Sequence, residues 1–409
     1  MKSAPRRGPT GLRAHPDLGR TRPPCRRATA QGRPASLLEG RFAREAARFH
    51  ASRRRSAERA CTSNGSERAS GESGSASGGS SPQKTKAGSS SAPLSQSTFI
   101  KTDSRVVAIG DLHGDLQKTV AALKLAGVLS VSPDGAPVWC GGDTVIVQLG
   151  DILDRGDHEI QILHLFLRLK EQAKLRGGDV FLLNGNHESL NICGDFRYVT
   201  SGGFLESARV AGLPPEMAGR FQAQLKARVA LFAPGGPIAQ ELANSYVALQ
   251  INDTVFAHGG IMPHHVDYGL GRLNDEMSGW MRGEEGARSP IVAMGSPDSV
   301  LWCREYSREQ WNTQVDRGRS CALLTKVLSE LGANQMVVGH TPQERGCNAE
   351  CDGKIWRIDV GMSSGVCNAA AQVIEIQPPA EEGARSQIRV LRAEGAYEAP
   401  LSRRKGMTG

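Results

Sequence analysis

The sequence predicts an α/β fold in which helices cover both faces of a β-sheet. Short apolar runs alternate with amphipathic stretches from residue 104 to residue 185, which is the pattern of consecutive βαβ units. Most of the apolar runs after residue 245 have the length of strands, so the second half of the chain is expected to be β-rich. No repeat of fixed period is present, and we assign residues 101–395 to one domain that is followed by a short tail, 396–409.

The elements follow in order from periodicity and from the residues that end each run. Strands are expected over residues 105–110, 144–150 and 179–185, with helices over 115–127 and 158–178 between them. Residues 204–232 have helical periodicity. Residues 245–260 read as two strands of a hairpin around Asn252 and Asp253, because Asn and Asp favour tight turns. Further strands are expected over 334–340, 354–361, 370–376 and 386–394.

The basic charge of the chain is concentrated in its first 60 residues. The formal net charge is +8, of which residues 1–60 contribute +12 and residues 61–100 contribute +1, so the remaining 309 residues carry −5. We therefore expect no nucleic-acid partner for the folded part. An Arg-rich, acid-poor leader without an apolar core is typical of an organelle transit peptide, and we assign residues 1–60 to import into the chloroplast or, alternatively, the mitochondrion. A disordered basic arm is the other interpretation.

Two further features limit the class of protein. Residues 61–100 are rich in Ser and Gly and are expected to form a flexible linker. No apolar run approaches the roughly 20 residues of a membrane span, so no membrane partner is expected. The nine cysteines contain no CxxC pair, and we expect ordinary thiols, with oxidation of Cys347 and Cys351 as the alternative.

Polar side chains follow five of the predicted strands directly. These strand ends read GDLHGD (110–115), GDILDRGD (150–157), GNHE (185–188), HGG (258–260) and GHTP (339–342). Because ligands bind at the carboxyl ends of strands in open α/β sheets, we expect these groups to meet in one crevice. Several carboxylates that face one another repel unless a cation lies between them. Oxygen and imidazole donors without a thiolate suit manganese, iron or zinc, and a pair of such ions activates water for attack on phosphorus.

The ordered set of motifs resembles the signature of the phosphoprotein phosphatase family within the calcineurin-like metallophosphoesterases. The resemblance covers about residues 105–365 and implies a four-layer αββα sandwich of two mixed β-sheets flanked by helices. It also implies two divalent metal ions and hydrolysis of phosphomonoesters by a hydroxide that bridges them. Transferred position by position, the implied metal ligands are Asp111, His113, Asp151, Asn186, His258 and His340, with Asp151 as the bridge.

The resemblance also assigns the remaining chemistry. His187 would be the general acid for the leaving oxygen, and Asp154 would orient it. Arg155 would grip the phosphate, together with Asn186. A second phosphate-binding arginine is expected, and Arg304 in VLWCREYS is our candidate, because a guanidinium can donate two hydrogen bonds to one phosphate.

Two departures from the mainstream family are visible. The first motif ends in Asp115 rather than Gln, and the chain has DVGMSSGVCNAA (359–370) where an SAPNY-type segment is usual. These departures are similar to those of the Shewanella-like protein phosphatases of plants and algae. They leave open a preference for phosphotyrosine or phosphoserine/threonine, and they argue against the regulatory subunits of the mainstream enzymes.

Several other polar residues are expected to be structural. His164 should be packed in its helix, Glu159 should complement a helix dipole, and His264 and His265 should lie on a surface loop. Asp115 and Asp157 are not counted as ligands. The function expected from the whole pattern is a metal-dependent phosphoprotein phosphatase. A related phosphoesterase acting on nucleotides such as diadenosine tetraphosphate, and a binding protein without catalysis, are the alternatives.

Overall fold

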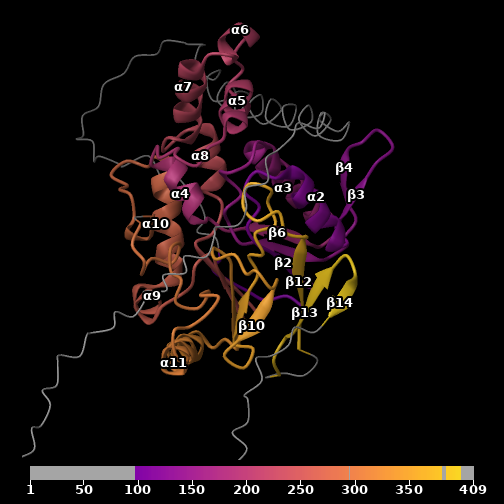
Figure 1. Ribbon diagram of the computed structural model, residues 1–409, viewed down its shortest axis with the longest axis vertical. Coiled ribbons are helices and arrows are strands. Elements are labelled where there is room, and N and C mark those ends of the chain that lie inside the picture. The colour runs from indigo at the N-terminus through magenta and orange to yellow at the C-terminus, as the bar shows by residue number, and fades with distance from the viewer. Residues whose placement is uncertain (1–96, 294, 380–383, 398–409) are drawn as a thin grey trace, which may run out of the picture.

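The computed structural model describes residues 97–293, 295–379 and 384–397. The predicted transit peptide (1–60), nearly all of the predicted linker (61–100) and most of the tail (396–409) lie outside the described residues. Two six-stranded sheets share one hydrophobic core, and helices cover their outer faces (Figure 1). The predicted four-layer sandwich of mixed sheets is therefore confirmed.

The first sheet has the order β14-β13-β12-β2-β5-β6. Its parallel part consists of β2 (Val106–Ile109), β5 (Val145–Gln148) and β6 (Asp179–Leu182). Because helices cover one face of these strands and the second sheet covers the other, the strands are almost uniformly buried and read as continuous apolar runs. The antiparallel part adds β12 (Gln372–Gln377), β13 (Gln387–Arg392) and β14 (Gly395–Tyr397).

The second sheet has the order β1-β7-β8-β9-β11-β10. The predicted hairpin is present as β7 (Ala248–Ile251) and β8 (Thr254–Ala257), with Asn252 in the left-handed region at its turn. β8 pairs in parallel with β9 (Gln335–Val338), which pairs in parallel with β11 (Ile355–Arg357). The edges are β1 (Phe99–Ile100) and β10 (Asn348–Glu350).

The helices lie around these sheets. α2 (Leu116–Leu125) and α3 (Glu159–Lys174) connect the parallel strands, and Asp115 caps α2 by accepting a hydrogen bond from the Lys118 amide. α5 (Ser201–Val210), α6 (Pro215–Ala218) and α7 (Phe221–Phe232) form a projection at the top of Figure 1. The other helices are α4 (Asn186–Ile192), α8 (Pro237–Leu242), α9 (Pro263–Tyr268), α10 (Leu270–Arg282), the 3-10 turn η1 (Ile291–Ala293) and α11 (Gln314–Leu331).

The predicted limits of the domain, 101 and 395, leave out one strand and cut another. β1 lies in the segment assigned to the linker, yet it pairs with β7. β14 extends two residues past position 395 and pairs with β13. A two-residue strand has no periodicity to read, so its pairing depends on the sheet that the rest of the chain builds. The hairpin of β3 (Leu129–Val131) and β4 (Pro137–Trp139) was also not predicted.

The prediction of ordinary thiols was wrong for two cysteines. Cys351 forms a disulfide with Cys321 of α11, across 30 residues of sequence, whereas Cys347 is buried and forms no disulfide within the described residues. The short spacing between Cys347 and Cys351 indicated the wrong pair. The true partner of Cys351 comes close to it only through the packing of α11. Among the described residues, no helix combines the length and the apolar character that crossing a membrane requires.

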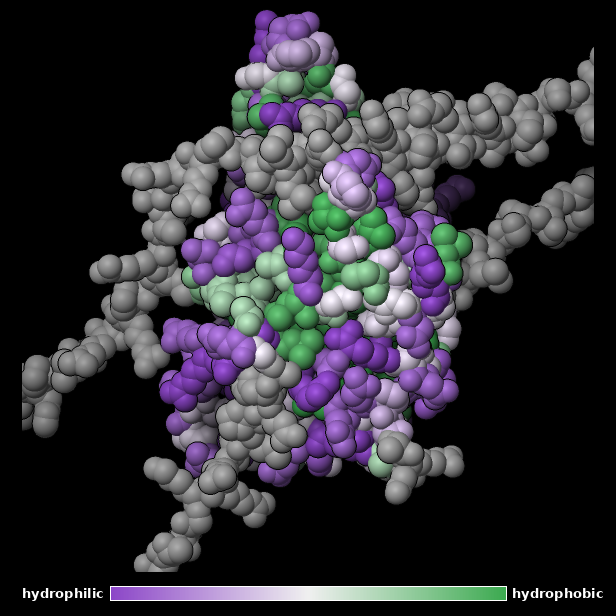
Figure 2. All heavy atoms as spheres, turned by 90° about the vertical axis from the view of Figure 1, so that its right-hand side faces the viewer, coloured by the Kyte–Doolittle hydropathy of each residue, from purple (hydrophilic) through white to green (hydrophobic). Residues whose placement is uncertain are grey.

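Polar and apolar residues are mixed on the surface. On the face shown in Figure 2, hydrophobic residues gather near the middle and hydrophilic residues surround them. The exposed part of the projection includes Phe221, with 56% of its surface accessible.

Candidate active site

The five predicted strand ends meet at one place between the two sheets. β2, β5 and β6 deliver their polar groups from the first sheet, and β8 and β9 deliver theirs from the second. The backbone turns sharply at these ends. Non-glycine residues with positive φ include His113 at 45°, Asp151 at 53°, Asp154 at 67°, Arg155 at 66° and His340 at 67°. Such conformations are costly for residues with a Cβ and tend to cluster at functional sites.

Two glycines let the backbone approach the carboxylates. A Cβ added at Gly185 would lie 2.2 Å from Oδ1 of Asp151, and one at Gly339 would lie 2.4 Å from Oδ1 of Asp111. Both distances are far inside van der Waals contact. The glycines of the GNHE and GHTP motifs are therefore required by the close approach of backbone to the site.

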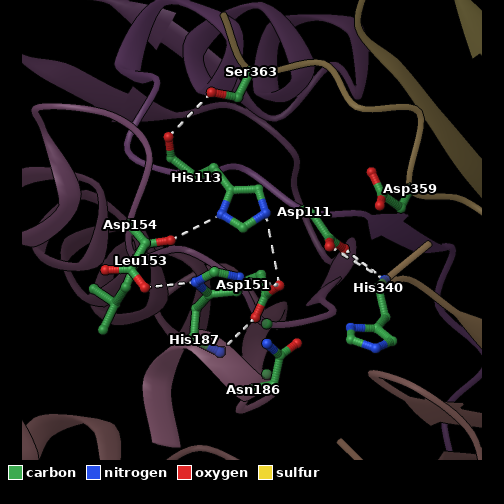
Figure 3. Close-up of polar contacts among 12 residues, drawn as sticks. Asp111, His113, Asp151, Leu153, Asp154, Asn186, His187, His340, Asp359 and Ser363 are labelled. Carbon is green, nitrogen blue, oxygen red and sulfur yellow. Dashed lines mark hydrogen bonds and ion pairs between the residues drawn. The ribbon is translucent and has the colours of Figure 1, made fainter. Parts of the chain in front are cut away.

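Asp151 lies at the centre of the cluster (Figure 3). Its Oδ2 is 3.3 Å from Nε2 of His258, 3.7 Å from Nε2 of His113 and 3.9 Å from Nε2 of His187. Two groups of buried donors whose ligand atoms lie within 4.8 Å of one another share this carboxylate. One group consists of His113, Asp151 and His187, and the other of Asp151, His258 and His340.

The charges in the cluster are strongly coupled. Burial raises the pKa of Asp151, but the charges of His258 and His187 lower it by more. The pKa of Asp151 therefore lies well below its usual value. Burial lowers the pKa of His258, but Asp151 and Asp111 raise it, to about 10. Burial and the carboxylate of Asp359 raise the pKa of Asp111 well above its usual value. The site therefore concentrates negative charge that calls for cations.

The histidines are oriented as metal ligands usually are. Nδ1 of His113 lies 2.9 Å from the Leu153 carbonyl oxygen, and Nδ1 of His258 lies 2.8 Å from the Leu149 carbonyl oxygen. A proton on Nδ1 would be held by each carbonyl, so Nε2 is the nitrogen that each ring would offer to a metal ion. Burial and His187 lower the pKa of His113 to about 3, so its ring is neutral.

His340 supplies a direct test of whether a metal ion fits. Its Nε2 is buried and has no hydrogen-bond partner among the described residues. Burial, followed by the charge of His258, lowers the pKa of His340 to about 2, so the ring is a neutral donor. A buried imidazole nitrogen without a partner costs free energy, and a divalent ion is the partner that suits it. The donor set thus fits a pair of divalent metal ions.

Two predicted ligands lie at the edge of the two groups. Asp111 belongs to neither group, and its carboxylate accepts hydrogen bonds of 3.2 Å from the His340 amide. Asn186 begins α4, and its Oδ1 lies 3.0 Å from Nε2 of His258. The structure brings both residues to the site, but their roles as ligands stay predictions.

His187 and Asp154 lie in contact. Nδ1 of His187 is 2.5 Å from Oδ2 of Asp154, which is fully buried. Burial lowers the pKa of His187, but Asp151 and Asp154 raise it above its usual value. The other oxygen of Asp154 accepts a hydrogen bond of 3.0 Å from Nδ2 of Asn191. The pair can therefore hold a proton at His187, whose Nε2 faces Asp151.

The two predicted phosphate-binding arginines lie on different sides of the site. Arg155 follows Asp154, stacks over the ring of Tyr198 at 5.0 Å, and has a buried Nε without a partner in the described chain. Arg304 is exposed and donates hydrogen bonds to the His340 carbonyl oxygen at 3.3 Å and to Thr341 Oγ1 at 2.9 Å. A cavity of about 310 Å³ opens beside Arg304, and Met262 and Trp302 form part of its wall.

Glu188 anchors the loop under Asp151. Its carboxylate accepts hydrogen bonds from the amides of Gly185, Asp151, Ile152 and Leu153 at 2.7–3.2 Å. Four backbone donors on one buried carboxylate fix the loops after β5 and β6 against each other. Glu188 therefore holds the loop that carries Asp151 in place.

One residue of the site escaped the sequence analysis. Asp359 lies two residues after the end of β11, is 2% exposed, and lies on the side of Asp111 and His340 in Figure 3. Its Oδ1 accepts a hydrogen bond of 2.8 Å from the Gly361 amide, and burial raises its pKa to about 6. Asp359 resembles the other strand ends, because it comes directly after Ile358, the last apolar residue that follows β11, and this signal could have found it.

Two of the structural assignments can be checked in the same region. His164 is buried and its Nε2 lies 3.0 Å from Glu241, so the packed position is confirmed. The surface position predicted for His265 was wrong: the residue is 4% exposed and its Nδ1 accepts a hydrogen bond from the Met262 amide. A short helix, α9, follows HGGIMP and turns His265 inward, whereas His264 is exposed.

Glu159 does more than complement a helix dipole. It is fully buried, pairs with Arg228 at 2.6 Å, and accepts a hydrogen bond from the Asp154 amide. Arg228 and Asn191 were both missed by the sequence analysis. Neither follows a strand, so no local pattern marks them.

Known proteins are similar to this chain over most of its length. A family model described as calcineurin-like phosphoesterase matches residues 104–344. The Shewanella-like protein phosphatase 2 of Arabidopsis thaliana is 39% identical over 343 residues, which cover 76% of this chain and 84% of that protein. The Shewanella-like protein phosphatase 1 of Plasmodium berghei (strain Anka) is 28% identical and covers 64% of this chain and 68% of its own length.

Solved structures show the same fold. A cold-active protein tyrosine phosphatase at 1.1 Å aligns with a TM-score of 0.56 at 23% identity, covering 74% of this chain and 80% of that chain. The cold-active enzyme of a psychrophilic Shewanella species aligns with a TM-score of 0.54 and covers 82% of its own chain. With the family match and the relative from Arabidopsis, these findings make the chain a phosphatase of the hydrolase class. It belongs to the calcineurin-like phosphoesterase family and, within that family, to the Shewanella-like protein phosphatases.

Proposed function

We propose that the enzyme removes phosphate from phosphorylated proteins, acting on phosphotyrosine, phosphoserine/threonine or both. The observation that carries the proposal is the buried carboxylate of Asp151, which is shared by two groups of metal-donor side chains. The pair of His187 and Asp154, which can hold a proton, and the two arginines, Arg155 and Arg304, lie around Asp151. This arrangement provides the parts that hydrolysis of a phosphomonoester requires.

The proposed metal-holding residues are Asp111, His113, Asp151, Asn186, His258 and His340. When bound, two divalent ions would supply an activated water and would neutralise charge on the phosphate. Oxygen and imidazole donors without thiolate favour manganese, with iron and zinc as the alternatives. Glu188 keeps the loop of Asp151 in place, since its carboxylate holds four backbone amides.

His187 holds the proton that the leaving oxygen needs. Nδ1 of the ring is engaged by Asp154, which fixes the ring and favours the protonated form. Nε2 then carries a proton toward the centre of the site, and the charges of Asp151 and Asp154, which raise the pKa of His187, favour that protonated form. Transfer of this proton from Nε2 to the departing alkoxide or phenoxide completes the cleavage.

The arginines bind and orient the phosphate. Arg304 is held at the rim by the His340 carbonyl and Thr341, and Arg155 is stacked on Tyr198. Each guanidinium can donate two parallel hydrogen bonds to phosphate oxygens. The amide of Asn186 adds a further polar contact without adding negative charge.

A peptide substrate is favoured over a nucleotide by the cavity beside Arg304. Met262 and Trp302 contribute apolar and aromatic surface there, and Arg308 contributes a charge that is paired with Glu305. Such a mixture suits amino-acid side chains next to the phosphorylated residue. A structural neighbour from a psychrophilic Shewanella species carries the name protein-tyrosine phosphatase, which makes phosphotyrosine the first substrate to test.

A substrate panel with added manganese tests the proposal. Purified enzyme is given phosphotyrosine peptides, phosphoserine/threonine peptides and diadenosine tetraphosphate at equal concentrations. The proposal expects turnover of phosphopeptides that is lost when a chelator removes the metal. Preferential hydrolysis of the dinucleotide would replace the proposal with the nucleotide alternative, and bound metal without any turnover would indicate a binding protein.

The partners and the location of the enzyme are proposed from the sequence. We propose chloroplast import by residues 1–60, with the mitochondrion as the alternative, and function without the regulatory subunits of the mainstream phosphatases. Residues 1–60 fused to a fluorescent protein should carry it into the organelle of a plant or algal cell. The same fusion with Arg41, Arg44 and Arg48 changed to Glu is the control, because a transit peptide must be basic and poor in acidic residues. A diffuse signal from the unaltered fusion would contradict the assignment.

A further inference from the structure

Arg228 is a charged side chain that lies entirely inside the protein. It belongs to α7 in the helical projection, far along the chain from every strand end of the site, and it is 0% exposed. Transfer of a guanidinium from water into a protein interior costs several kcal/mol unless its donors are satisfied and its charge is paired. A buried arginine at this position therefore needs hydrogen-bond acceptors and an opposite charge around it.

The guanidinium is held by a dedicated set of acceptors. Nε and NH2 donate to the same oxygen, Asn191 Oδ1, at 3.0 and 2.7 Å. NH1 donates to Glu159 Oε2 at 2.6 Å and to Ser207 Oγ at 3.2 Å. The ring of Phe232 lies 4.5 Å from the guanidinium carbon. These contacts allow one orientation of Arg228 and leave little freedom for Asn191.

Both acceptors lead to Asp154. Nδ2 of Asn191 donates to Asp154 Oδ1 at 3.0 Å and to the His187 carbonyl oxygen at 2.9 Å. Glu159 accepts a hydrogen bond from the Asp154 amide. With Oδ1 on Asn191 and Oδ2 on His187, the carboxylate of Asp154 is fixed at both oxygens. A chain of hydrogen bonds thus runs from α7 to the ring of His187.

The orientation of Asn191 depends on Arg228. An amide side chain can be turned over so that its oxygen and nitrogen change places, and Asp154 needs the nitrogen. Two hydrogen bonds from a cation to Oδ1 of Asn191 forbid the reversed orientation, in which the cation would face an NH2 group. The charge of Arg228 therefore decides which atom Asn191 presents to Asp154.

We infer that Arg228 is a positioning residue for proton donation: through Asn191 and Glu159 it holds Asp154 in the orientation that aligns His187 with the leaving group. The inference rests on the proposed function, since it assigns a role within the same site. It also gives the helical projection a part in catalysis, because Arg228 comes from α7.

The dependence of the hydrolysis rate on the leaving group distinguishes a role of Arg228 in proton donation from a purely structural role. Phenolate resembles the tyrosine side chain, whose pKa is about 10, and needs a proton to depart, whereas p-nitrophenolate is a much weaker base and departs without one. A poorly aligned proton donor should slow hydrolysis of phenyl phosphate more than hydrolysis of p-nitrophenyl phosphate. Loss of folded or metal-loaded enzyme should slow both equally.

The test variants are Arg228→Met and Asn191→Ala, and the matched control is Ser207→Ala. Ser207 is buried and touches Arg228, but it has no contact on the path to Asp154. We expect kcat for phenyl phosphate to fall about 10- to 100-fold in both variants, kcat for p-nitrophenyl phosphate to fall less than about 3-fold, and KM and metal content to stay unchanged. The control should lose equal, small factors on both esters.

The outcomes are distinct. Equal losses on both esters in Arg228→Met and Asn191→Ala would overturn the inference and leave the proposed function standing. Wild-type enzyme that hydrolyses neither ester would overturn the proposed function itself. Circular dichroism and metal analysis check folding. Asn191→Ala leaves the Arg228–Glu159 pair intact. If Arg228→Met does not fold, the result for Asn191→Ala alone decides the inference. If neither variant folds, Arg228 is a core residue and the inference is wrong.

Discussion

Asp151 meets two requirements that oppose each other. It is 2% exposed, which disfavours its charge, yet it must be ionised to serve two groups of donors. The surrounding imidazoles of His258 and His187 resolve the conflict by lowering its pKa well below the usual value. His187 in turn depends on Asp151 and Asp154 for its raised pKa. The residues of this site therefore cannot be replaced independently.

Exchange of His187 and of Asp151 should have different consequences. His187→Asn removes the proton donor while keeping a polar group of similar size, so metal content should stay near two ions and turnover should fall about 10²- to 10⁴-fold. Asp151→Asn removes the shared carboxylate and should lose metal as well as turnover. Metal analysis of the purified proteins together with kcat on phosphopeptides checks both. Near wild-type turnover in His187→Asn would refute its assigned role.

His265 should make stability depend on pH. Burial, followed by His264, lowers the pKa of His265 to about 4, and its Nδ1 accepts a hydrogen bond that protonation would break. The unfolded chain binds this proton at about pH 6.5, so the free energy of unfolding should fall between pH 6.5 and pH 4, by up to about 1.4 kcal/mol per pH unit. Above pH 6.5 this contribution is fully present.

Urea unfolding across that range checks the prediction. His265→Asn keeps an acceptor for the Met262 amide but does not titrate, so its unfolding free energy should vary less with pH than that of the wild type. His264→Asn is the control, because His264 is exposed and should leave the pH dependence in place. Identical curves for His265→Asn and wild type would contradict the assignment.

At the scale of elements, the ends of strands carry the chemistry and the connections decide how firmly they are held. β11 illustrates the first point, since Asp359 follows it just as Asp151 follows β5. α11 illustrates the second. It is tied to the turn between β10 and β11 by the disulfide of Cys321 and Cys351, so the edge of the second sheet is linked to the helix that covers it.

Removal of this disulfide should destabilise the protein without changing its fold. The bond closes a loop of 30 residues, and loop-closure entropy predicts a loss of roughly 3 to 4 kcal/mol in unfolding free energy. Guanidinium unfolding of Cys321→Ser/Cys351→Ser beside wild type checks the value. Cys140→Ser, which changes an exposed free thiol, is the control. Reductant should destabilise the wild type and have no effect on the double variant.

At the scale of the whole molecule, the folded unit begins earlier than its composition suggests. The Thr98 carbonyl accepts a hydrogen bond from the Gln250 amide, and the Ile100 carbonyl accepts one from the Asn252 amide, both at 2.9 Å. Thr98 also accepts a hydrogen bond from Asn274 inside the protein. Two residues of an apparent linker therefore close one edge of the second sheet.

Truncation should reveal this boundary. A chain that begins at Ser97 should be as stable as the full-length protein, whereas one that begins at Lys101 should lose roughly 1–3 kcal/mol, because three hydrogen bonds to Thr98 and Ile100 are removed. Thermal unfolding of the two chains, each assayed for phosphatase activity, checks the difference. Equal midpoints would show that β1 contributes nothing to the stability of the sheet.

The family and most of the site could be read from the sequence because both depend on local patterns. An apolar strand that ends in Asp, His or Asn is visible in a few residues, and five such ends in order were enough to predict the fold and the cluster around Asp151. The buried strands and the long helices were predicted for the same reason, since periodicity and capping act over one or two turns.

Only the tertiary structure decided the remaining features, because they depend on contacts between distant segments. The partner of Cys351 comes from a helix 30 residues away, and β1 is a strand only beside β7. His265 is buried because α9 turns it inward. Arg228 reaches Asp154 through Asn191, across 37 residues in each step. Packing of elements creates such contacts, and the local sequence around each residue contains no sign of the partner.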